Sequence, residues 1–159
     1  TSDGVSATLA LVDLWQAPGK LPAALEATAK EKGWSFREMA SPARLLVVAA
    51  PDVVRENLVA LHLLKLCHFL QDHDGFDVEL WYLRDRTGRE VDFLLTHDGR
   101  PWLAVEAKTA GTDINPSLRY FRDRLKIPFV YQVALEGTRD FVEDGIRCLP
   151  AADFLGALV

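Results

Sequence analysis

The stretch that decides the fold runs from Trp81 to Thr109 and reads WYLRDRTGREVDFLLTHDGRPWLAVEAKT. Its hydrophobic residues are mainly Val, Phe, Leu, Trp and Tyr, which are typical of strands. Two glycine-containing turns, at 85–88 and 97–100, divide the stretch into three parts. The pattern therefore predicts a meander of three short strands.

Acidic residues interrupt the second and third of these strands. Strict alternation along the second strand predicts two faces, one with Val91, Phe93 and Leu95 and the other with Glu90, Asp92 and Leu94. On the third strand, Leu103, Val105 and Ala107 alternate with Ala104, Glu106 and Lys108. Each strand should thus have one apolar face and one face that carries its charges.

The register of this hairpin follows from the position of Pro101. A loop from His97 to Pro101 keeps the proline, which cannot donate a hydrogen bond, out of the ladder. The predicted pairs are then Thr96 with Trp102, Leu94 with Ala104, Asp92 with Glu106, and Glu90 with Lys108. A slip by one residue would move charges onto the apolar face, so the pattern itself favours this register. Because like charges opposed across two strands are destabilising, we expect a divalent cation to compensate the acidic pair.

These residues resemble the PD-(D/E)XK nuclease superfamily, with Asp92 on one strand and Glu106-Ala107-Lys108 on the next. The resemblance is greatest to the domain of unknown function that follows an AAA-type ATPase module in many prokaryotic proteins. It covers roughly residues 51–135 and includes the segments RENLVA (55–60), YLR (82–84), REVDF (89–93) and VEAK (105–108). Val91 stands where the superfamily name has proline.

The resemblance implies the roles of the site residues. Mg²⁺ (or Mn²⁺) would be held by Asp92, Glu106, the carbonyl of Ala107 and Glu56 of the first helix. Lys108 would orient or deprotonate the attacking water, with its pKa lowered by partial burial. Glu90 and Gln132 are expected as auxiliary residues near this site.

Composition sets limits on the class of protein. The chain has 159 residues, of which 49% are hydrophobic and 26% charged, as expected of one folded domain. No apolar run approaches the ~20 residues of a membrane-spanning helix. The net charge of −5 argues mildly against a surface that binds nucleic acid everywhere.

The two cysteines lack metal-ligand spacing and are expected to be buried thiols in a reducing cytoplasm. The start without methionine suggests a fragment.

The flanking segments predict the remaining elements. We expect residues 1–50 to form a strand (8–14), a helix (21–32) and a strand (44–50) that pack on a nuclease-like domain of residues 51–159. In that domain we expect a helix at 53–71 with Glu56 at the head of an apolar stripe, then the meander, a helix at 116–126 after Asn115-Pro116, strands at 129–135 and 146–149, and a helix at 151–159. The predicted fold class is α/β, with the α-β-β-β-α-β core of restriction-endonuclease-like proteins and a mixed sheet flanked by helices.

Basic residues between positions 84 and 126 suggest a nucleic-acid contact. This span contains nine basic and seven acidic residues. The candidates for contact with a phosphate backbone are Arg84, Arg86, Arg119, Arg122 and Lys126. A solvated surface with an Arg119–Asp123 ion pair explains the same pattern.

Three functions are compatible with the sequence. The first is metal-dependent hydrolysis of phosphodiester bonds in DNA, by a domain whose ATPase module is absent from this chain because no P-loop surrounds Lys20. The second is an inactive module of an AAA-type ATPase that docks DNA or protein. The third is an interaction domain that forms a homodimer through its apolar N-terminal segment.

Overall fold

The computed structural model describes residues 51–110 and 113–158, together with short pieces at 15–16, 26–27, 30–31 and 35–39. Three helices are bounded within these ranges: α2 (Pro51–Asp74), α3 (Pro116–Leu125) and α4 (Ala151–Gly156). The strands are β1 (Trp15–Gln16), β2 (Ser35–Met39), β3 (Val78–Arg84), β4 (Glu90–His97), β5 (Arg100–Ala110), β6 (Phe129–Glu136), β7 (Phe141–Glu143) and β8 (Ile146–Pro150).

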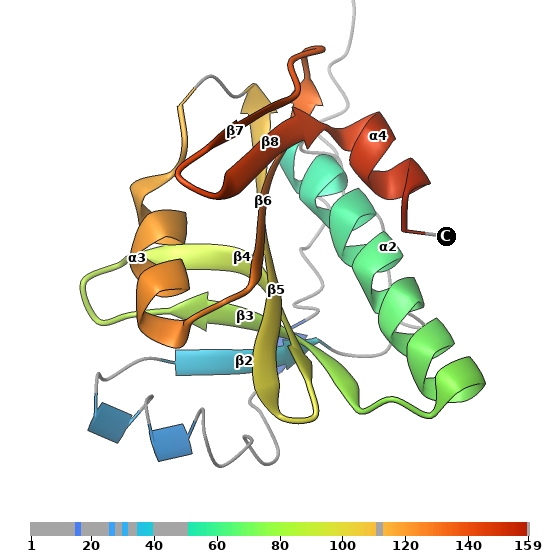
Figure 1. The fold of residues 1–159 in the computed structure, drawn as a ribbon, viewed down its shortest axis with the longest axis vertical. Coiled ribbons are helices and arrows are strands. Elements are labelled where there is room, and N and C mark those ends of the chain that lie inside the picture. Colours follow the sequence, from blue (N-terminus) through green and yellow to red (C-terminus); the bar gives the residue numbers. More distant parts are fainter. Residues whose placement is uncertain are drawn as a thin grey trace, which may run out of the picture.

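The described strands form one mixed sheet in the order β1-β2-β3-β4-β5-β6-β8-β7 (Figure 1). The pairs β5–β6 and β6–β8 are parallel, and the others are antiparallel. The predicted α/β class, with a mixed sheet flanked by helices, is confirmed. The predicted order of helix, three-strand meander, helix and strand corresponds to α2, β3–β5, α3 and β6.

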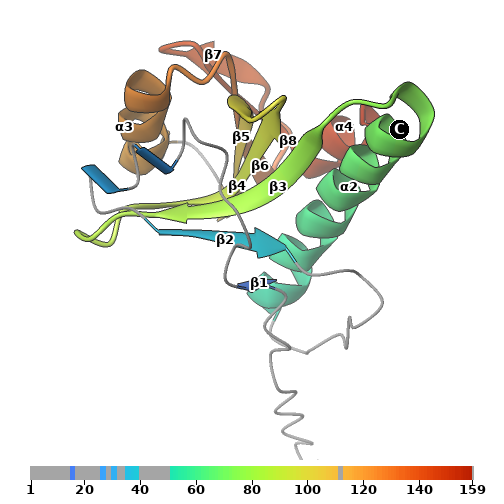
Figure 2. The same cartoon turned by 90° about the horizontal axis from the view of Figure 1, so that it is seen from below.

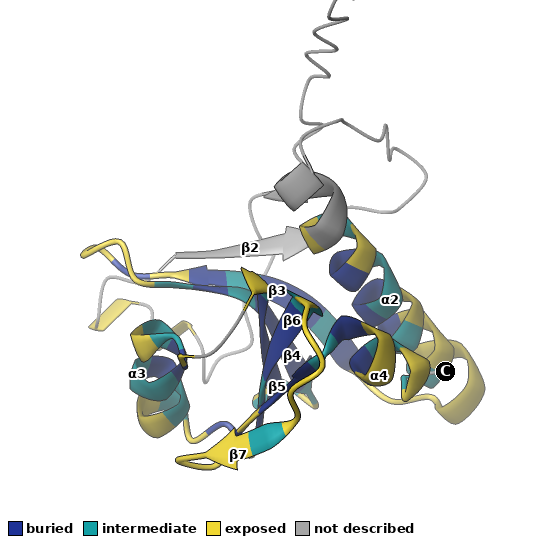
Figure 3. Cartoon of the chain, turned by 90° about the horizontal axis from the view of Figure 1, so that it is seen from above, coloured by how far each residue is buried: buried dark blue, intermediate teal, exposed yellow. Residues whose placement is uncertain are grey.

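Helices cover both faces of the sheet, and each interface has its own hydrophobic cluster (Figures 2 and 3). The cluster beneath α2 and α4 includes Leu63, Phe93, Val105 and Phe154. The cluster beneath α3 includes Trp81, Leu94, Ala104, Leu118 and Phe121. The central strands are therefore buried on both sides, which confines polar side chains to the places where they find partners.

The β4–β5 register is partly as predicted. Leu94 pairs with Ala104, but a bulge after Leu95 pairs Thr96 with Pro101 instead of Trp102. The expectation that Pro101 lies outside the ladder is thus wrong. The loop is tight, because Asp98 and Gly99 have φ angles of 49° and 70°, and the bulge absorbs the one-residue difference.

A second bulge lies in β4 at Asp92 and Phe93. Trp81 pairs with Leu94 and Leu83 with Val91, so two steps along β3 correspond to three along β4. Val91 consequently packs in the α3 cluster, whereas Phe93 belongs to the α2 cluster. The strict alternation predicted for Val91, Phe93 and Leu95 fails at Val91, because the extra residue turns the strand.

Other boundaries differ by a few residues. Helix α2 begins two residues earlier than predicted and ends three later, and β1, β2 and β7 were not predicted. Residues 26–27 and 30–31 are helical, within the helix expected at 21–32, whereas the strands expected at 8–14 and 44–50 lie outside the described residues. None of the helices described is long and apolar enough to cross a membrane.

Candidate functional site

The candidate site is built across β4 and β5 by two carboxylates, each of which accepts a hydrogen bond from the backbone of the other strand. Oδ2 of Asp92 accepts a hydrogen bond of 2.9 Å from the backbone N–H of Ala107. Oε2 of Glu106 accepts one of 3.4 Å from the backbone N–H of Asp92. These bonds continue the register that pairs Phe93 with Val105, and they bring the two side chains together as predicted.

Burial and repulsion raise the pKa of Asp92. Desolvation is the largest cause, and the charge of Glu106 adds to it, so that the pKa rises from 3.8 to about 8. The hydrogen bond from Ala107 and the charge of Lys108 offset only part of this effect. Glu106 is buried and Asp92 is half-buried, so the structure contains the acidic pair that the sequence predicted.

Lys108 pairs with the more deeply buried member of this pair. Its Nζ lies 2.9 Å from Oε1 of Glu106, whose side chain is 4% exposed, whereas that of Lys108 is 40% exposed. Burial by itself would lower the pKa of Lys108, but its hydrogen bond to Glu106 and the neighbouring carboxylates outweigh burial and raise the pKa. In the metal-free site the pKa therefore shifts in the direction opposite to the expected lowering, because the neighbouring carboxylates favour the ammonium form.

Glu56 reaches the site from α2. Its side chain is exposed, and its charge raises the pKa values of both Asp92 and Lys108, so it lies within electrostatic range of them. Ala60, Leu63 and Cys67 are buried on the same stripe of the helix, as the spacing predicted. The structure therefore brings together Asp92, Glu106 and Lys108, and it places Glu56 within electrostatic range of them.

Asn115 is a site residue that the sequence interpretation identified only as a helix cap. Its Oδ1 accepts a hydrogen bond of 2.9 Å from the backbone N–H of Ser117 and caps α3. Its Nδ2 donates to Oε1 of Glu106. The Asn-Pro pair indicated the cap, but the second hydrogen bond depends on the packing of α3 against β5, which no local pattern reports.

Gln132 holds Asn115 in place. It is 1% exposed, and it lies on β6 in register with Glu106. Its Oε1 accepts from the backbone N–H of Asn115 at 2.8 Å, and its Nε2 donates to the carbonyl of Asp113 at 2.9 Å. The structure thus places Gln132 beside the site, where it positions the loop before α3.

Glu90 lies apart from these residues. The hydroxyl of Tyr82 donates a hydrogen bond of 2.5 Å to Oε2 of Glu90, and Arg84 lies 3.7 Å from the same oxygen. Burial, together with Glu90, raises the pKa of Tyr82 to about 12. Glu90 is thus directed to β3 rather than to Lys108, because the bulge at Asp92 and Phe93 changes the direction of the preceding residues.

The donor set suits a small divalent cation. Within an extended strand, the N–H and C=O of one residue point to the same edge, so the carbonyl of Ala107 is directed to the side of Asp92. Mg²⁺ is commonly held by one or two carboxylates and retains several waters. Among the described residues, no group of three or more His, Cys, Asp or Glu side chains is placed to hold a metal ion. Asp92, Glu106 and the Ala107 carbonyl are oxygen donors of the chemical kind that Mg²⁺ takes.

The arginines of α3 do not form the open stripe that the sequence suggested. Arg119 pairs with Glu143 and, at 3.1 Å, with Asp144, both on the β7–β8 hairpin. Arg122 lies 2.7 Å from Asp123 and donates to the carbonyl of Asp144. The alternative Arg119–Asp123 pair is replaced by these contacts. Much of the positive charge of this stripe is therefore matched by acids.

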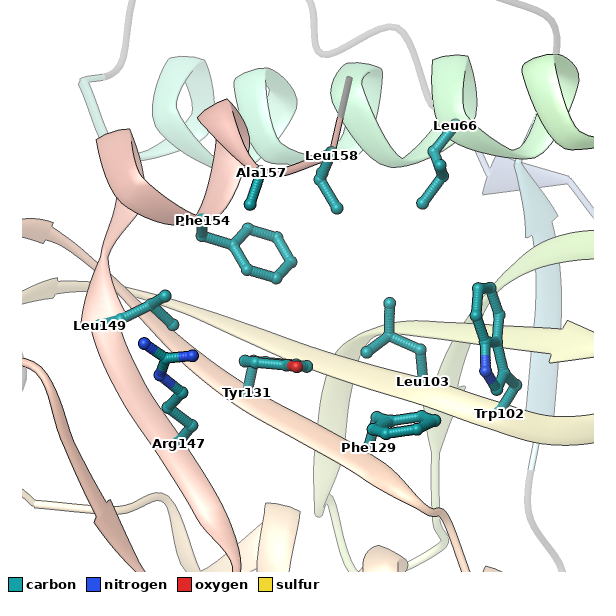
Figure 4. A pocket seen from close by; sticks show the side chains of 10 residues that line it. All are labelled: Leu66, Trp102, Leu103, Phe129, Tyr131, Arg147, Leu149, Phe154, Ala157 and Leu158. Atoms are coloured by element: carbon teal, nitrogen blue, oxygen red, sulfur yellow. The ribbon is translucent and has the colours of Figure 1, made fainter.

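A separate cavity of about 310 Å³ lies between α2, α4 and the N-terminal parts of β5 and β6 (Figure 4). Its lining is mainly apolar and aromatic, with one arginine, and comprises Leu66, Trp102, Leu103, Phe129, Tyr131, Arg147, Leu149, Phe154, Ala157 and Leu158. No acidic residue lines this cavity, so it is distinct from the site that contains Asp92 and Glu106.

Comparisons with known proteins identify the family. No curated protein and no solved structure matches this chain. Residues 53–154, more than half of the chain, match the domain of unknown function DUF4143. The matched range contains Glu56, Asp92, Glu106, Lys108, Asn115 and Gln132. The chain therefore belongs to the DUF4143 family.

Proposed function

We propose that this domain hydrolyses phosphodiester bonds in DNA with the help of Mg²⁺ or Mn²⁺. The observation that carries the proposal is the pair of the half-buried Asp92 and the buried Glu106, linked by hydrogen bonds from the backbone of Ala107 and Asp92 and accompanied by Lys108. Burying two carboxylates together is costly unless a cation compensates them. The resemblance to PD-(D/E)XK nucleases, with these residues in this order, supports the same chemistry.

Each side chain has a defined part in this proposal. Asp92, Glu106 and the carbonyl of Ala107 are the inner ligands, and Glu56 acts from the edge of the site. The cation, when bound, would lower the pKa of water and neutralise charge on the scissile phosphate. Asn115 and Lys108 orient Glu106 by binding its Oε1.

Lys108 acts in this proposal as a cation. The neighbouring carboxylates raise its pKa in the metal-free site, which favours the protonated Nζ, and this ammonium group would donate hydrogen bonds to the attacking water or to a phosphate oxygen. It does not serve as the general base. Its side chain is 40% exposed and therefore accessible to a substrate, and its Nζ contacts Oε1 of Glu106.

The second candidate is an inactive module of an AAA-type ATPase that docks DNA or protein. The specific observation in its favour is that acids match the charges of Arg119 and Arg122, so that less positive charge is available for a substrate. In both cases we propose that the chain is the C-terminal part of an ATPase-linked protein. The buried free thiols Cys67 and Cys148 fit a cytoplasmic location, and a homodimer is compatible with either candidate.

Plasmid nicking tests the proposal. Supercoiled DNA is incubated with the wild type, Asp92→Asn and Glu90→Gln, each with Mg²⁺, Mn²⁺ or EDTA. We expect metal-dependent nicking by the wild type and Glu90→Gln, and none by Asp92→Asn. Glu90→Gln is the matched control because it neutralises an acid on the same strand outside the site. An intact plasmid with the wild type in both metals would favour the docking module.

A further inference from the structure

The structure assigns a DNA-backbone contact to Arg89 and Arg124, which lie against the ring of Tyr120 on α3, and to Arg86 of the β3–β4 turn; we name these four residues the arginine cluster. The inference rests on the proposed function, because it names the surface that holds the same substrate. It replaces Arg119 and Arg122, which acids already engage, with arginines elsewhere on the same side of the molecule.

Tyr120 is the platform of the arginine cluster. The guanidinium carbon of Arg89 lies 4.3 Å from the centroid of its ring, and that of Arg124 lies 3.7 Å from it. The ring of Tyr120 meets Phe121 edge to face at 5.1 Å, and Phe121 is fully buried. Two cations are therefore held over a ring that is anchored to the core, which lowers the entropy they lose on binding a ligand.

The turn between β3 and β4 supplies the other side of the cluster. Oδ1 of Asp85 accepts hydrogen bonds from the backbone N–H groups of Thr87 and Arg89, and Oδ2 lies 2.9 Å from Nη1 of Arg89. Asp85 is buried, and despite that burial these hydrogen bonds lower its pKa. The carboxylate thus stays charged and fixes the turn that carries Arg86 and Arg89 beside α3.

The cluster has an excess of positive charge. Among the described residues, Arg89 of the cluster pairs with the buried Asp85. Arg86 and Arg124 are exposed, and neither forms an ion pair with an acid among the described residues. A polyanion complements this surface, and guanidinium groups bind phosphates well.

The spacing along α3 connects the cluster with the candidate site. Asn115, at the start of the helix, bonds Glu106, and Arg124 is nine residues further on. At 1.5 Å per residue this separation is about 14 Å, or about four base-pair steps of 3.4 Å. A duplex lying along α3 would place one phosphate at the carboxylates and others at the cluster. Because the guanidinium groups of Arg89 and Arg124 already lie against the ring of Tyr120, we do not expect nucleic-acid bases to stack on it. We therefore infer contact with the sugar-phosphate backbone of a duplex.

Binding in EDTA tests the inference without any dependence on hydrolysis. A short fluorescein-labelled DNA duplex is titrated with the wild type, Arg86→Ala/Arg124→Ala and Arg119→Ala/Arg122→Ala, from about 50 to about 200 mM NaCl. The two double variants lose the same formal charge, and melting temperatures confirm that each is folded. We expect the slope of log K against log[salt] to fall by about two units in Arg86→Ala/Arg124→Ala, and to stay close to that of the wild type in the control.

A second pair of variants tests the platform. Tyr120→Leu removes the ring and should weaken binding, whereas Tyr120→Phe keeps the ring and should bind as the wild type does. Equal losses in the two double variants, no duplex binding by the wild type at the lowest salt, or binding to anionic lipid vesicles in place of DNA would each overturn the inference. If the duplex binds through Arg86 and Arg124 while plasmid stays intact with both metals, the proposed hydrolysis fails and the arginine cluster stands.

Discussion

Nζ of Lys108 lies 2.9 Å from Oε1 of Glu106, and this contact joins a half-exposed cation to a buried carboxylate. In the metal-free site the carboxylate raises the pKa of the lysine and so favours its charged form, and the lysine orients the carboxylate. This relationship separates two roles that are often assigned together to a lysine in a hydrolytic site. A charged lysine can position water and stabilise phosphate charge, but it cannot accept the proton of the water.

The first prediction follows from that charge. Lys108→Met should lower the rate of DNA cleavage by ~10²–10⁴-fold, which is the range of positioning and proton-transfer contributions. Lys108→Arg should retain part of the activity, because it keeps the positive charge although its geometry differs. Initial nicking rates under Mg²⁺ saturation measure both effects. A general-base role would contradict this ordering, since arginine does not titrate and would be as inactive as methionine.

The second prediction concerns stability against pH without metal. The pKa of Asp92 is raised in the folded state, so the folded protein binds more protons than the unfolded chain between pH ~4 and ~8. The contribution of Asp92 to stability is therefore greatest below pH 4 and is lost as the pH rises toward 8. At pH 8 in EDTA, Asp92→Asn should be more stable than the wild type by roughly 1 kcal/mol or more.

Urea unfolding at pH 5 and pH 8 measures this difference. Asp98→Asn is the matched control, because Asp98 is exposed at the β4–β5 turn and asparagine tolerates its positive φ of 49°. The control should follow the wild type at both pH values. If Asp92→Asn were less stable than the wild type at pH 8, the ionised carboxylate of Asp92 would not destabilise the folded state, and the prediction would be wrong.

The third prediction concerns the binding of Mg²⁺. A cation that binds only the folded state stabilises it by RT ln(1 + [L]/Kd), so a hundredfold excess over Kd contributes about 2.7 kcal/mol. Millimolar Mg²⁺ should raise the melting temperature of the wild type at pH 8 and leave that of Asp92→Asn unchanged. Lys108→Met should still respond, because both carboxylates remain. A flat response of the wild type would contradict a metal site.

The fourth prediction separates the two roles of Asn115. Asn115→Asp keeps an acceptor for the N–H of Ser117, so the cap of α3 survives, but it places a carboxylate against Oε1 of Glu106. Asn115→Ala removes both contacts and should cost about 1 kcal/mol through the lost cap. We expect Asn115→Asp to be less stable than the wild type at pH 8 without Mg²⁺, because two carboxylates then lie together. Added Mg²⁺ should restore much of the lost free energy of unfolding. Urea unfolding with and without Mg²⁺ measures this recovery, which Asn115→Ala should not show to the same extent.

The sequence predicted the local part of this protein. Alternation of polar and apolar residues placed Asp92, Glu106 and Lys108 together, since a misplaced register would expose the apolar faces of the strands. Helical spacing aligned Glu56 with Ala60, Leu63 and Cys67, and Asn-Pro indicated the start of α3. These features depend on periodicity within single elements and on side chains that are near in the chain.

Only the tertiary structure decided the rest. The bulge at Asp92 and Phe93 depends on how three strands fit together, and it turned Glu90 toward Tyr82. The pairing of Arg119 with Glu143 joins residues 24 positions apart, and that of Asn115 with Glu106 depends on where α3 packs. The direction in which the pKa of Lys108 shifts was likewise decided by the proximity of Glu106. Charged and polar groups have several candidate partners in a sequence, and the partner that they find depends on which elements the packed core brings within about 3 Å.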